Sequence, residues 1–447
     1  MVDLTGTSRL SGTTLAGGSP WRLVRLSEHA RTVVDRWLAG ERLEASQRML
    51  ARALVDRGLA RPRWSPDWDR GAIEVVVPVR DDVAHLATLL GQLADFSVTV
   101  VDDGSSDPAP VARCAEAAGA RLVRLATSRG PGAARNAGAL ASTRPWLWFI
   151  DVDVVLDDAP ALAARLLASG HDPAVGAIAP RLRGVGDARR GRFERAHGPL
   201  DLGPAGGLVA PGTLRSYVPS ACLLVRREAL AEGFDEALPV GEDVDLVWRL
   251  VDAGWLVRYD ADLVIGHLTR PTWRAWWRQR VGYGTSAAPL ARRHGARLAP
   301  VVVDGSTASV LVGLLTGQAA LVAAATALLG SRINAKLTRD LEHRGALVAR
   351  LVGRALAGGV GGSARAVVRT YGPLLGVGAL VPRLRRRVWL IVALGTLWRW
   401  RARGGVTARD VPLAMADDLA YGVGVWLGAW RARDATALRP LITGPEG

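Results

Sequence analysis

Two apolar runs that each end in a pair of acidic residues constrain the fold of this chain more than any other feature. One run ends at Asp102 and Asp103, and the other, about fifty residues later, ends at Asp151 and Asp153. The interval leaves room for helix, strand and turn, so the two runs can be neighbouring strands of one sheet. Carboxylates at the carboxyl ends of parallel strands converge on the crevice where such sheets bind ligands. We expect one pair to hold a base and ribose, and the other to hold a divalent cation with its diphosphate.

Strand-like and helix-like segments alternate between residue 72 and about residue 285. Apolar runs predict strands at residues 73–78, 97–101, 121–125 and 146–150, and helices at residues 83–93, 109–118 and 132–141. The first strand is apolar apart from Glu74, as expected for a strand covered on both faces. This rhythm predicts an α/β, Rossmann-like domain whose mostly parallel sheet is flanked by helices.

Residues 1–68 predict a small separate module. Residues 1 to about 20 are rich in Gly, Ser and Thr and are expected to form a loose leader. Helices are predicted at residues 27–38 and 45–57, followed by a linker. This helical, winged-helix-like module favours a peptide-docking or structural role. No nucleic-acid partner is expected, because no helix here is rich in Arg, Asn and Gln.

Residues 300–447 predict a helical region that is partly membrane-interfacial. No charged residue occurs from residue 305 to 331, a run long enough to span a bilayer, although it contains Gly, Ser, Thr and Gln. Further on, the basic residues 383–387 adjoin an apolar run that ends at Trp398 and Trp400. This combination suits the surface of an anionic membrane. A true span and a helical bundle packed on the α/β domain remain the alternatives.

The net charge of +15 comes almost entirely from arginine, because Lys336 is the single lysine. A high-GC genome accounts for most of this bias, and attraction to diphosphates or anionic lipid accounts for the rest. Cys114 and Cys222 cannot build a disulfide framework or a zinc cluster, which fits a reducing cytosol. The N-terminus lacks a secretory pattern. We therefore expect a cytoplasmic protein, peripheral at the inner face of the cell membrane.

The first strand and the Asp102–Asp103 pair predict a nucleoside site. Pro78, Val79 and Arg80 end the first strand, where backbone groups are free to meet a base. Asp103 can accept a hydrogen bond from the imide N–H of uracil, and Asp102 or Ser105 can reach the ribose. The alternative is that this acidic turn merely caps a helix.

A glycine-rich stretch, residues 128–138, opens the helix that follows the third predicted strand. Small residues such as Gly132 let a nucleotide approach the backbone, and a helix N-terminus favours anions. Arg135 and Asn136 lie one turn in, where they can reach phosphate or the acidic strand ends. The dinucleotide fingerprint lacks its third glycine, which disfavours a dehydrogenase. A simple turn that starts a helix remains the alternative.

Asp151 and Asp153 predict a metal site. If extended structure continues through Val152, both side chains point the same way. Mg²⁺ or Mn²⁺ prefers such oxygen ligands and can bridge to a diphosphate. His267 can complete the metal shell through an imidazole nitrogen. The alternatives are a solvated turn and a structural histidine.

Glu242 and Asp243 begin a further predicted helix. Acidic residues stabilise a helix N-terminus in any case, but a catalytic base placed there would be aimed into the cleft. Both residues are therefore candidate catalytic groups. The glycine-rich residues 203–212 are the candidate for a mobile lid.

Taken in order, these motifs resemble those of the family 2 glycosyltransferases with the GT-A fold, over residues 72–285. The resemblance implies an inverting, metal-dependent enzyme that transfers a hexose from a UDP-sugar. It implies that Asp103 contacts uracil and that Asp243 is the general base. It assigns ribose and metal to Asp151 and Asp153, and metal to His267. The QxxRW motif of processive members is absent, so processive synthesis is not expected.

The N-terminal module, residues 241–246 and the tail at residues 417–422 also resemble the mycofactocin-system glycosyltransferases. This narrower resemblance implies that β-linked glucose is added to a peptide-derived redox cofactor. One alternative is a glycosyltransferase that acts on a cell-envelope lipid or polysaccharide. Another is a non-catalytic scaffold that binds a nucleotide-sugar, although the intact acidic residues oppose it.

Overall fold

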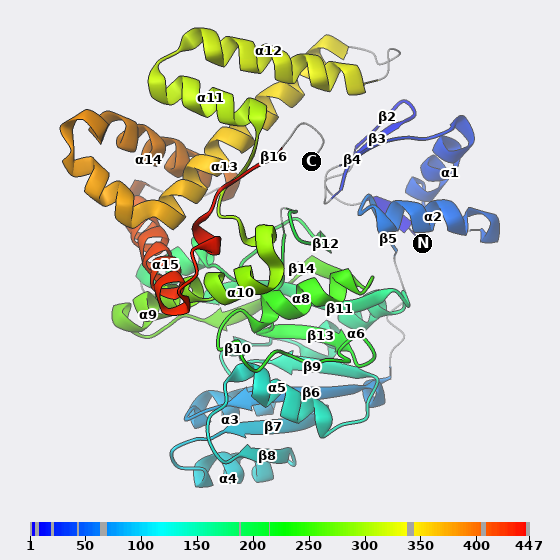
Figure 1. Ribbon diagram of the computed structural model, residues 1–447. Helices are drawn as coiled ribbons and strands as arrows, with labels where there is room; N and C mark the ends of the chain where they lie inside the picture. Colours follow the sequence, from blue (N-terminus) through cyan, green and yellow to red (C-terminus); the bar gives the residue numbers. More distant parts are fainter. Residues whose placement is uncertain are drawn as a thin grey trace. The chain divides into compact units, whose positions relative to one another are not determined.

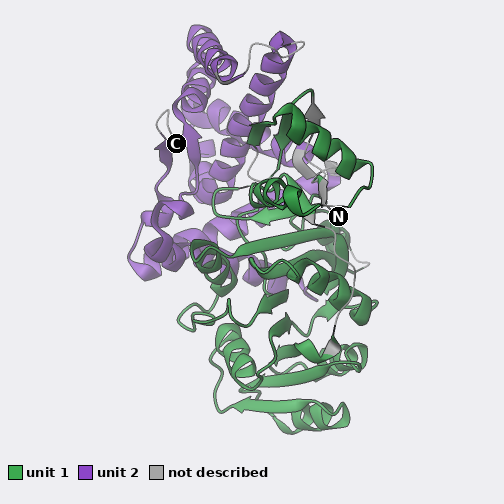
Figure 2. Cartoon of the chain, turned by 90° about the vertical axis from the view of Figure 1, so that its right-hand side faces the viewer, with its two compact units in different colours: residues 1–269 green, residues 270–447 purple. Residues whose placement is uncertain are grey.

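The computed structural model divides the chain into two compact units, residues 1–269 and residues 270–447 (Figure 2). It describes every residue apart from positions 1, 5–8, 19–21, 43, 63–68, 187–188, 214, 338–343, 404–407 and 444–447. The predicted α/β domain ends at residue 285, whereas the first compact unit ends at Thr269. Helix α9, Trp273–Thr285, therefore belongs to the second unit.

A nine-stranded sheet forms the centre of the first unit, in the order β10-β14-β11-β13-β9-β6-β7-β8, with β12 paired to β14 (Figure 1). The strands are β6 Ile73–Val79, β7 Ser97–Asp103, β8 Arg121–Leu125, β9 Trp146–Ile150, β10 Val154–Val155, β11 Val175–Val185, β12 Gly207–Val209, β13 Cys222–Arg226 and β14 Leu256–Leu268. The four strands β9, β6, β7 and β8 are parallel, as predicted. Beyond β9 the sheet is mixed, because β13 runs antiparallel between β9 and β11.

The central strands read as continuous apolar runs because helices cover both faces of the sheet. Val75 in β6 and both Trp148 and Phe149 in β9 are fully buried. The register pairs Val79 of β6 with Asp102 of β7. The carboxyl ends of the parallel strands therefore lie at the same edge, as predicted. The expectation that the two acidic runs end neighbouring strands is wrong, because β6 lies between β7 and β9.

The predicted helices of this sheet are confirmed as α3 Val83–Gln92, α4 Ala109–Ala117, α5 Pro131–Leu140 and α8 Glu242–Asp252. Two further helices, α6 Ala159–Gly170 and α7 Arg189–His197, were not predicted. Helix α5 approaches β6 and β7 closely at Gly138. A Cβ atom there would overlap Val76 and lie 3.0 Å from Val101 Cγ2. This glycine fixes the height of α5, and of its functional residues, above the sheet.

The N-terminal module contains strands that the sequence analysis did not predict. They are β1 Val2–Leu4, β2 Arg9–Ser11, β3 Thr14–Gly17, β4 Arg22–Arg25 and β5 Ala60–Pro62. The expectation of a loose leader is wrong for the described part of residues 1–20, because β2, β3 and β4 form an antiparallel sheet. The predicted helices are confirmed as α1 Glu28–Leu38 and α2 Arg48–Asp56. Leu15 of β3 packs with residues of both helices in a common core.

The second unit is helical, as predicted. Its helices after α9 are α10 Ala287–His294, α11 Gly305–Thr316, α12 Ala319–Lys336, α13 Arg344–Leu380, α14 Pro382–Arg403 and α15 Val411–Ala432. Strands β15 Val302–Asp304 and β16 Leu441–Thr443 pair in parallel. The uncharged run at 305–331 is divided between α11 and α12, because Gly317 adopts a left-handed conformation with φ of 75°. In the described part of the chain, no helix is long and apolar enough to cross a bilayer.

Buried ion pairs join four helices of the second unit. Asp417 of α15 pairs with Arg280 of α9 at 2.7 Å and with Arg399 of α14 at 3.1 Å. Asp418 pairs with Arg399 at 3.1 Å and with Arg369 of α13 at 3.2 Å. Arg399 is almost wholly buried, whereas the adjacent Trp400 is exposed. Breaking such a pair leaves an uncompensated charge and costs about 3–5 kcal/mol.

The close approach of α5 to the sheet gives a test of the fold. We expect Gly138→Ala to lower the free energy of unfolding by about 1–3 kcal/mol, because the added methyl group overpacks a closed core. Gly91→Ala in α3 is the matched control. A Cβ atom at Gly91 meets nothing within 4 Å, so it should raise stability by about 0.5–1 kcal/mol. Urea unfolding of both variants measures the difference, and equal midpoints would contradict this account of α5.

Candidate active site

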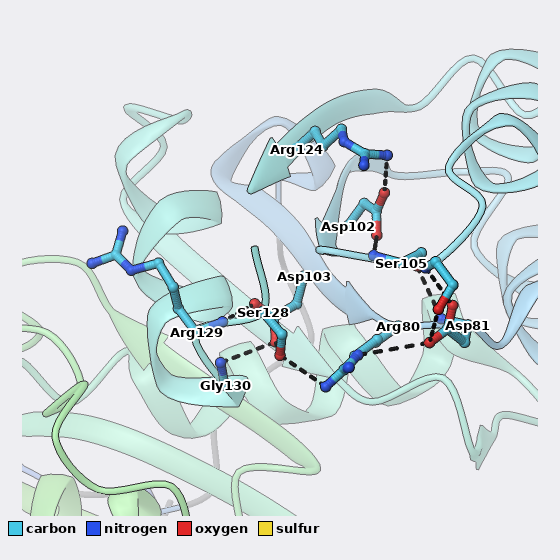
Figure 3. Close-up of polar contacts among 10 residues, drawn as sticks. Arg80, Asp81, Asp102, Asp103, Ser105, Arg124, Ser128, Arg129 and Gly130 are labelled. Carbon is cyan, nitrogen blue, oxygen red and sulfur yellow. Dashed lines mark hydrogen bonds and ion pairs between the residues drawn. The ribbon is translucent and has the colours of Figure 1, made fainter. Parts of the chain in front are cut away.

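Asp103 fastens the loop that leads into α5 (Figure 3). Its carboxylate accepts hydrogen bonds from Ser128 Oγ at 2.8 Å and from the backbone N–H groups of Arg129 at 2.7 Å and Gly130 at 3.0 Å. A carboxylate offers about four acceptor positions, so one remains for a ligand. Gly104 follows with φ of 68°, and a Cβ there would collide with the backbone at Ser128. Asp103, the predicted base-binding residue, therefore also holds the loop before α5 in place.

Asp102 lies almost fully buried beside Asp103, at the end of β7. It accepts a hydrogen bond from the backbone N–H of Ser105 at 2.8 Å and pairs with Arg124 at 3.1 Å. Burial by itself raises the pKa of Asp102, but the hydrogen bonds from Ser105 and the charge of Arg124 outweigh it, so the pKa is below its ordinary value. Asp102 is therefore ionised and held in place.

The residues at the carboxyl end of β6 lie at the same edge of the sheet as Asp102 and Asp103. Pro78 and Val79 are the last residues of β6, and Arg80 donates to Ser128 Oγ at 3.0 Å while its side chain remains 56 % exposed. Asp81 adopts a φ of 56°, which is rare for a residue other than glycine. Its carboxylate accepts from the backbone N–H of Ser106 at 2.7 Å (Figure 3). The sequence did not indicate a role for Asp81, because its contact with Ser106 joins residues 25 positions apart and leaves no local pattern.

Arg135 links three elements of the first unit. Its guanidinium bonds to Asp151 at the end of β9 at 2.7 Å and to Glu242 at the start of α8 at 2.8 Å. The ring of Phe234 lies 5.4 Å from the guanidinium carbon. Burial lowers the pKa of Arg135, but the two carboxylates raise it above its ordinary value. Of its two predicted partners, phosphate or acidic strand ends, the side chain contacts the second.

Asn136 and Gly132 position neighbouring segments. The amide of Asn136 accepts from the backbone N–H of Phe234 at 2.8 Å, and it donates to the Phe234 carbonyl at 2.8 Å and to Glu236 at 3.1 Å. These bonds use both ends of the amide, so Asn136 holds a loop in this structure. Gly132 lies beside the start of α8, since a Cβ there would lie 3.6 Å from Glu242 Cγ, an ordinary van der Waals contact.

The adjacent acids Glu242 and Asp243 have different environments. Glu242 is buried and forms an ion pair with Arg135. Asp243 is part-buried and has no ion pair of this kind among the described residues. Burial, followed by the charge of Glu242, raises the pKa of Asp243 to about 7. Of the two predicted catalytic acids, Asp243 can exchange a proton near neutral pH.

The Asp151–Asp153 segment is a turn and not a continued strand. The backbone N–H of Val154 donates to the Asp151 carbonyl at 3.0 Å, so the expected extension through Val152 is wrong. Asp151 therefore turns to Arg135, whereas Asp153 Oδ1 lies 3.3 Å from His267 Nε2. Across the described ranges, no three acidic, histidine or cysteine side chains converge on one point.

Asp153 and His267 nevertheless fit a divalent cation. The two side chains are largely buried and already in contact across β10 and β14. Mg²⁺ is commonly held by one or two protein ligands together with the phosphates of a substrate. An oxygen and an imidazole nitrogen form a suitable partial ligand set, which a diphosphate would complete.

The glycine-rich segment 203–212 is partly anchored. Its middle forms β12, which pairs with β14, and Tyr259 Oη donates to the Gly203 carbonyl at 2.7 Å. A segment paired in a sheet opens less readily than an unpaired loop. The expectation of a mobile lid therefore applies at most to the few residues on either side of β12.

The raised pKa of Asp243 predicts a dependence of stability on pH. Because the folded-state pKa lies above the unfolded value, charging this carboxyl disfavours the folded state as pH rises toward and past 7. We expect Asp243→Asn to raise the free energy of unfolding by about 1–3 kcal/mol at pH 8 and by less at pH 5. Urea unfolding at both pH values measures this. The control Glu116→Gln, on an exposed face of α4, should change little at either pH, and a pH-independent effect of Asp243→Asn would contradict the assignment.

Comparisons with known proteins place this geometry in a family. Residues 75–234 match Glycosyl transferase family 2. The pre-mycofactocin glycosyltransferases of two Mycobacterium tuberculosis strains, CDC 1551 / Oshkosh and ATCC 25618 / H37Rv, are each 37 % identical over 452 residues, covering 96 % of this chain and 95 % of theirs.

Two solved structures of glycosyltransferases are more distant. One is the mannosyltransferase PcManGT from Pyrobaculum calidifontis in complex with GDP-Man and Mn²⁺, with 18 % identity, a TM-score of 0.40, and coverage of 84 % of this chain and 98 % of that one. The other is glucosyl-3-phosphoglycerate synthase from Mycobacterium tuberculosis in complex with Mn²⁺, UDP and glucosyl-3-phosphoglycerate. Its identity is 19 %, its TM-score 0.37, and the coverage 52 % of this chain and 88 % of that one.

Three observations lead to one assignment. They are the mixed sheet flanked by helices, the acidic residues at its strand ends, and the sequence identity to the Mycobacterium tuberculosis relatives over nearly the whole chain. The chain is a glycosyltransferase with a GT-A fold, and it belongs to the mycofactocin-type members of glycosyltransferase family 2.

Proposed function

We propose that this enzyme transfers a hexose, with inversion, from a UDP-sugar to a peptide-derived redox cofactor of the mycofactocin type. Glucose in a β linkage is the proposed product group. The observation that carries the proposal is the pair of unlike acids at the start of α8. Glu242 forms an ion pair with Arg135, while the pKa of Asp243 is raised to about 7. The names of the relatives from Mycobacterium tuberculosis support the choice of acceptor.

In the proposed reaction, an acceptor hydroxyl attacks the anomeric carbon from the face opposite the nucleotide. The bond from that carbon to the acceptor oxygen forms as its bond to the diphosphate oxygen breaks. Asp243 takes the hydroxyl proton, a role for which a pKa near the working pH is suited. Glu242 is the weaker candidate for this role, because its Oε1 atom is already bonded to Arg135 at 2.8 Å. No covalent glycosyl-enzyme is required, so a single carboxylate suffices.

The donor is proposed to bind along the carboxyl ends of β6, β7 and β9. Asp103 retains one acceptor position for the uracil N–H, and Asp102 with Ser105 would meet the ribose. The exposed Arg80 side chain is placed to approach phosphate. Asp153 and His267 would hold Mn²⁺ or Mg²⁺, which when bound supplies Lewis-acid stabilisation of the departing diphosphate. Asp151 bonds to Arg135 through Oδ1, so its other carboxylate oxygen could join that site.

The N-terminal module supports a peptide-derived acceptor. It is fastened to the α/β domain through Asp172, which pairs with Arg52 of α2 at 2.8 Å and with Arg258 of β14 at 3.0 Å. Arg258 and Asp172 are both buried. A module anchored in this way keeps a fixed distance from the sheet, as delivery of a bound acceptor would require.

We infer in addition that the enzyme works in the cytoplasm, peripheral to an anionic membrane surface. The arginine-rich helices of the second unit support this inference, and the same feature favours a cell-envelope lipid acceptor as the second candidate function. Mass spectrometry of extracts from a strain that lacks the enzyme separates the two. Loss of a glycosylated redox cofactor supports the first, and loss of an envelope glycolipid supports the second.

Removal of the proposed base should abolish transfer and spare binding. We expect Asp243→Asn to lower kcat by about 10²–10⁴-fold, because the acceptor proton then has no nearby base. Release of UDP from UDP-glucose in the presence of acceptor measures transfer, and calorimetry measures donor affinity, which should be retained. Asp157→Asn, in an exposed turn, is the matched control. Near-normal transfer by Asp243→Asn would remove this residue from the role.

Loss of the proposed metal ligand should act on donor binding instead. We expect Asp153→Ala to lower UDP-sugar affinity in Mn²⁺ by about 10–100-fold, toward the value that the unaltered enzyme has in chelator. A donor screen with and without Mn²⁺ measures this, with Asp157→Ala as the control. If the unaltered enzyme binds donor equally well in chelator, the metal site is refuted.

A further inference from the structure

The junction of α13 and α14 presents apolar side chains to solvent. We call residues 373–390 the hairpin tip. Its exposed apolar side chains are Leu374, Val377, Leu380, Val381, Leu384, Trp389 and Leu390. Leu380 is 79 % exposed and Val377 63 %. A concentration of exposed large apolar side chains in one short segment indicates a place of interaction.

The local structure explains why these side chains are not buried. Pro373 lies inside α13, and Tyr371 departs from helical geometry with φ of −104° and ψ of 17°, so the last turns of the helix are bent from the rest. Before the bend, α13 packs tightly on α14, where Gly361 and Gly395 leave room for the partner helix. Figure 1 shows the two helices side by side, in gold and orange. Beyond the bend, α13 still contacts α14, since a Cβ atom at Gly378 would lie 3.3 Å from Val388 Cγ2. The side chains of Leu374, Val377 and Leu380 in this part of α13 are exposed.

A second apolar stripe continues the patch. Met415, Leu419 and Val423 of α15 are spaced four residues apart and are all exposed, so they share one face of that helix. Leu419 reaches the start of the hairpin tip, since a Cβ atom at Gly372 would lie 3.6 Å from its Cδ1. The exposed apolar surface therefore extends over two neighbouring helices.

The charge of this region has a single sign. Residues 344–403 contain twelve arginines and no Asp or Glu. Four of these arginines, at positions 383, 385, 386 and 387, lie exposed within the hairpin tip. None of the ion pairs found in the described part of the chain involves them. Helix stability does not explain their position, because cations in the first turns of α14 oppose the helix dipole.

We propose that the hairpin tip and the adjoining stripe of α15 dock on an anionic phospholipid bilayer. This inference deepens the proposed peripheral location and rests on it. Leucine and valine side chains would enter the interface, arginine stems would extend toward phosphate groups, and Trp389 would lie at headgroup level. In a two-fold dimer through this face, the same arginines would oppose one another. An anionic bilayer offers phosphate groups to the arginines and an apolar interior to the leucine and valine side chains.

The test uses the full chain and vesicles of stated composition. Flotation compares binding to phosphatidylcholine alone with binding to mixed phosphatidylglycerol and phosphatidylcholine. We expect binding to the mixed vesicles only, and expect the triple variant R385Q/R386Q/R387Q to lower the partition coefficient by roughly a hundredfold. R42Q/R113Q/R165Q removes the same charge from exposed positions of the first unit and should leave binding unchanged.

A second pair of variants tests the apolar contribution without changing the arginines. We expect Leu380→Asp to lower vesicle binding at least tenfold, while Met49→Asp, at an exposed position of α2, should have a minor effect. Circular dichroism confirms that each variant is folded. Equal binding to neutral vesicles, full binding by the triple variant, or a solution dimer that Leu380→Asp converts to monomer would each overturn the proposal. The assay needs neither donor nor acceptor, so its failure is distinct from a failure of the transfer reaction.

Discussion

The buried guanidinium of Arg135 is the interaction on which the candidate site depends. It comes from the second turn of α5 and joins the end of β9 to the start of α8, two elements far apart in the chain. A buried charge is tolerable only when it is paired and hydrogen-bonded. Asp151 and Glu242 supply that pairing, so the loss of either would leave the arginine with a single carboxylate partner. The same bonds hold α8 against the sheet, and with it the proposed base.

This arrangement separates two acids that the sequence places side by side. Glu242 receives the positive charge, and Asp243 receives burial and a negative neighbour. Glu242 is therefore engaged in an ion pair, and Asp243 is able to accept a proton near neutral pH. Asp102 and Asp103 at the end of β7 also have a structural role, because each accepts hydrogen bonds from backbone N–H groups of a nearby turn. The same two residues are the proposed nucleoside ligands. The acidic residues of this site support the fold and the proposed chemistry at once.

The second unit uses charge in two opposite ways. Inside it, Asp417 and Asp418 neutralise arginines from three other helices and so fix the bundle. At the hairpin tip, arginines remain exposed next to leucine, valine and tryptophan. The same residue type therefore serves a closed core and an open surface. Which role an arginine takes depends on whether α15 lies within reach of its side chain.

The local pattern of the sequence determined the strands β6, β7, β8 and β9, their helices, and the placement of acidic residues at one edge of the sheet. These follow from period and composition, because a strand covered on both faces must be apolar and a parallel sheet brings its carboxyl ends together. The short strands β1 to β4 were missed, since three or four residues carry too little periodicity to distinguish a hairpin from a loop.

Only the tertiary structure decided what each acid does. The turn at Val152 sends Asp151 and Asp153 to different partners, and the bond between Arg135 and Glu242 spans 107 residues of chain. The pKa of a carboxyl group depends on its burial and on neighbouring charges. Neither can be predicted from the residue type or from the spacing of residues along the chain. The sequence therefore placed the acids at one edge, and long-range packing chose the one that can act as a base.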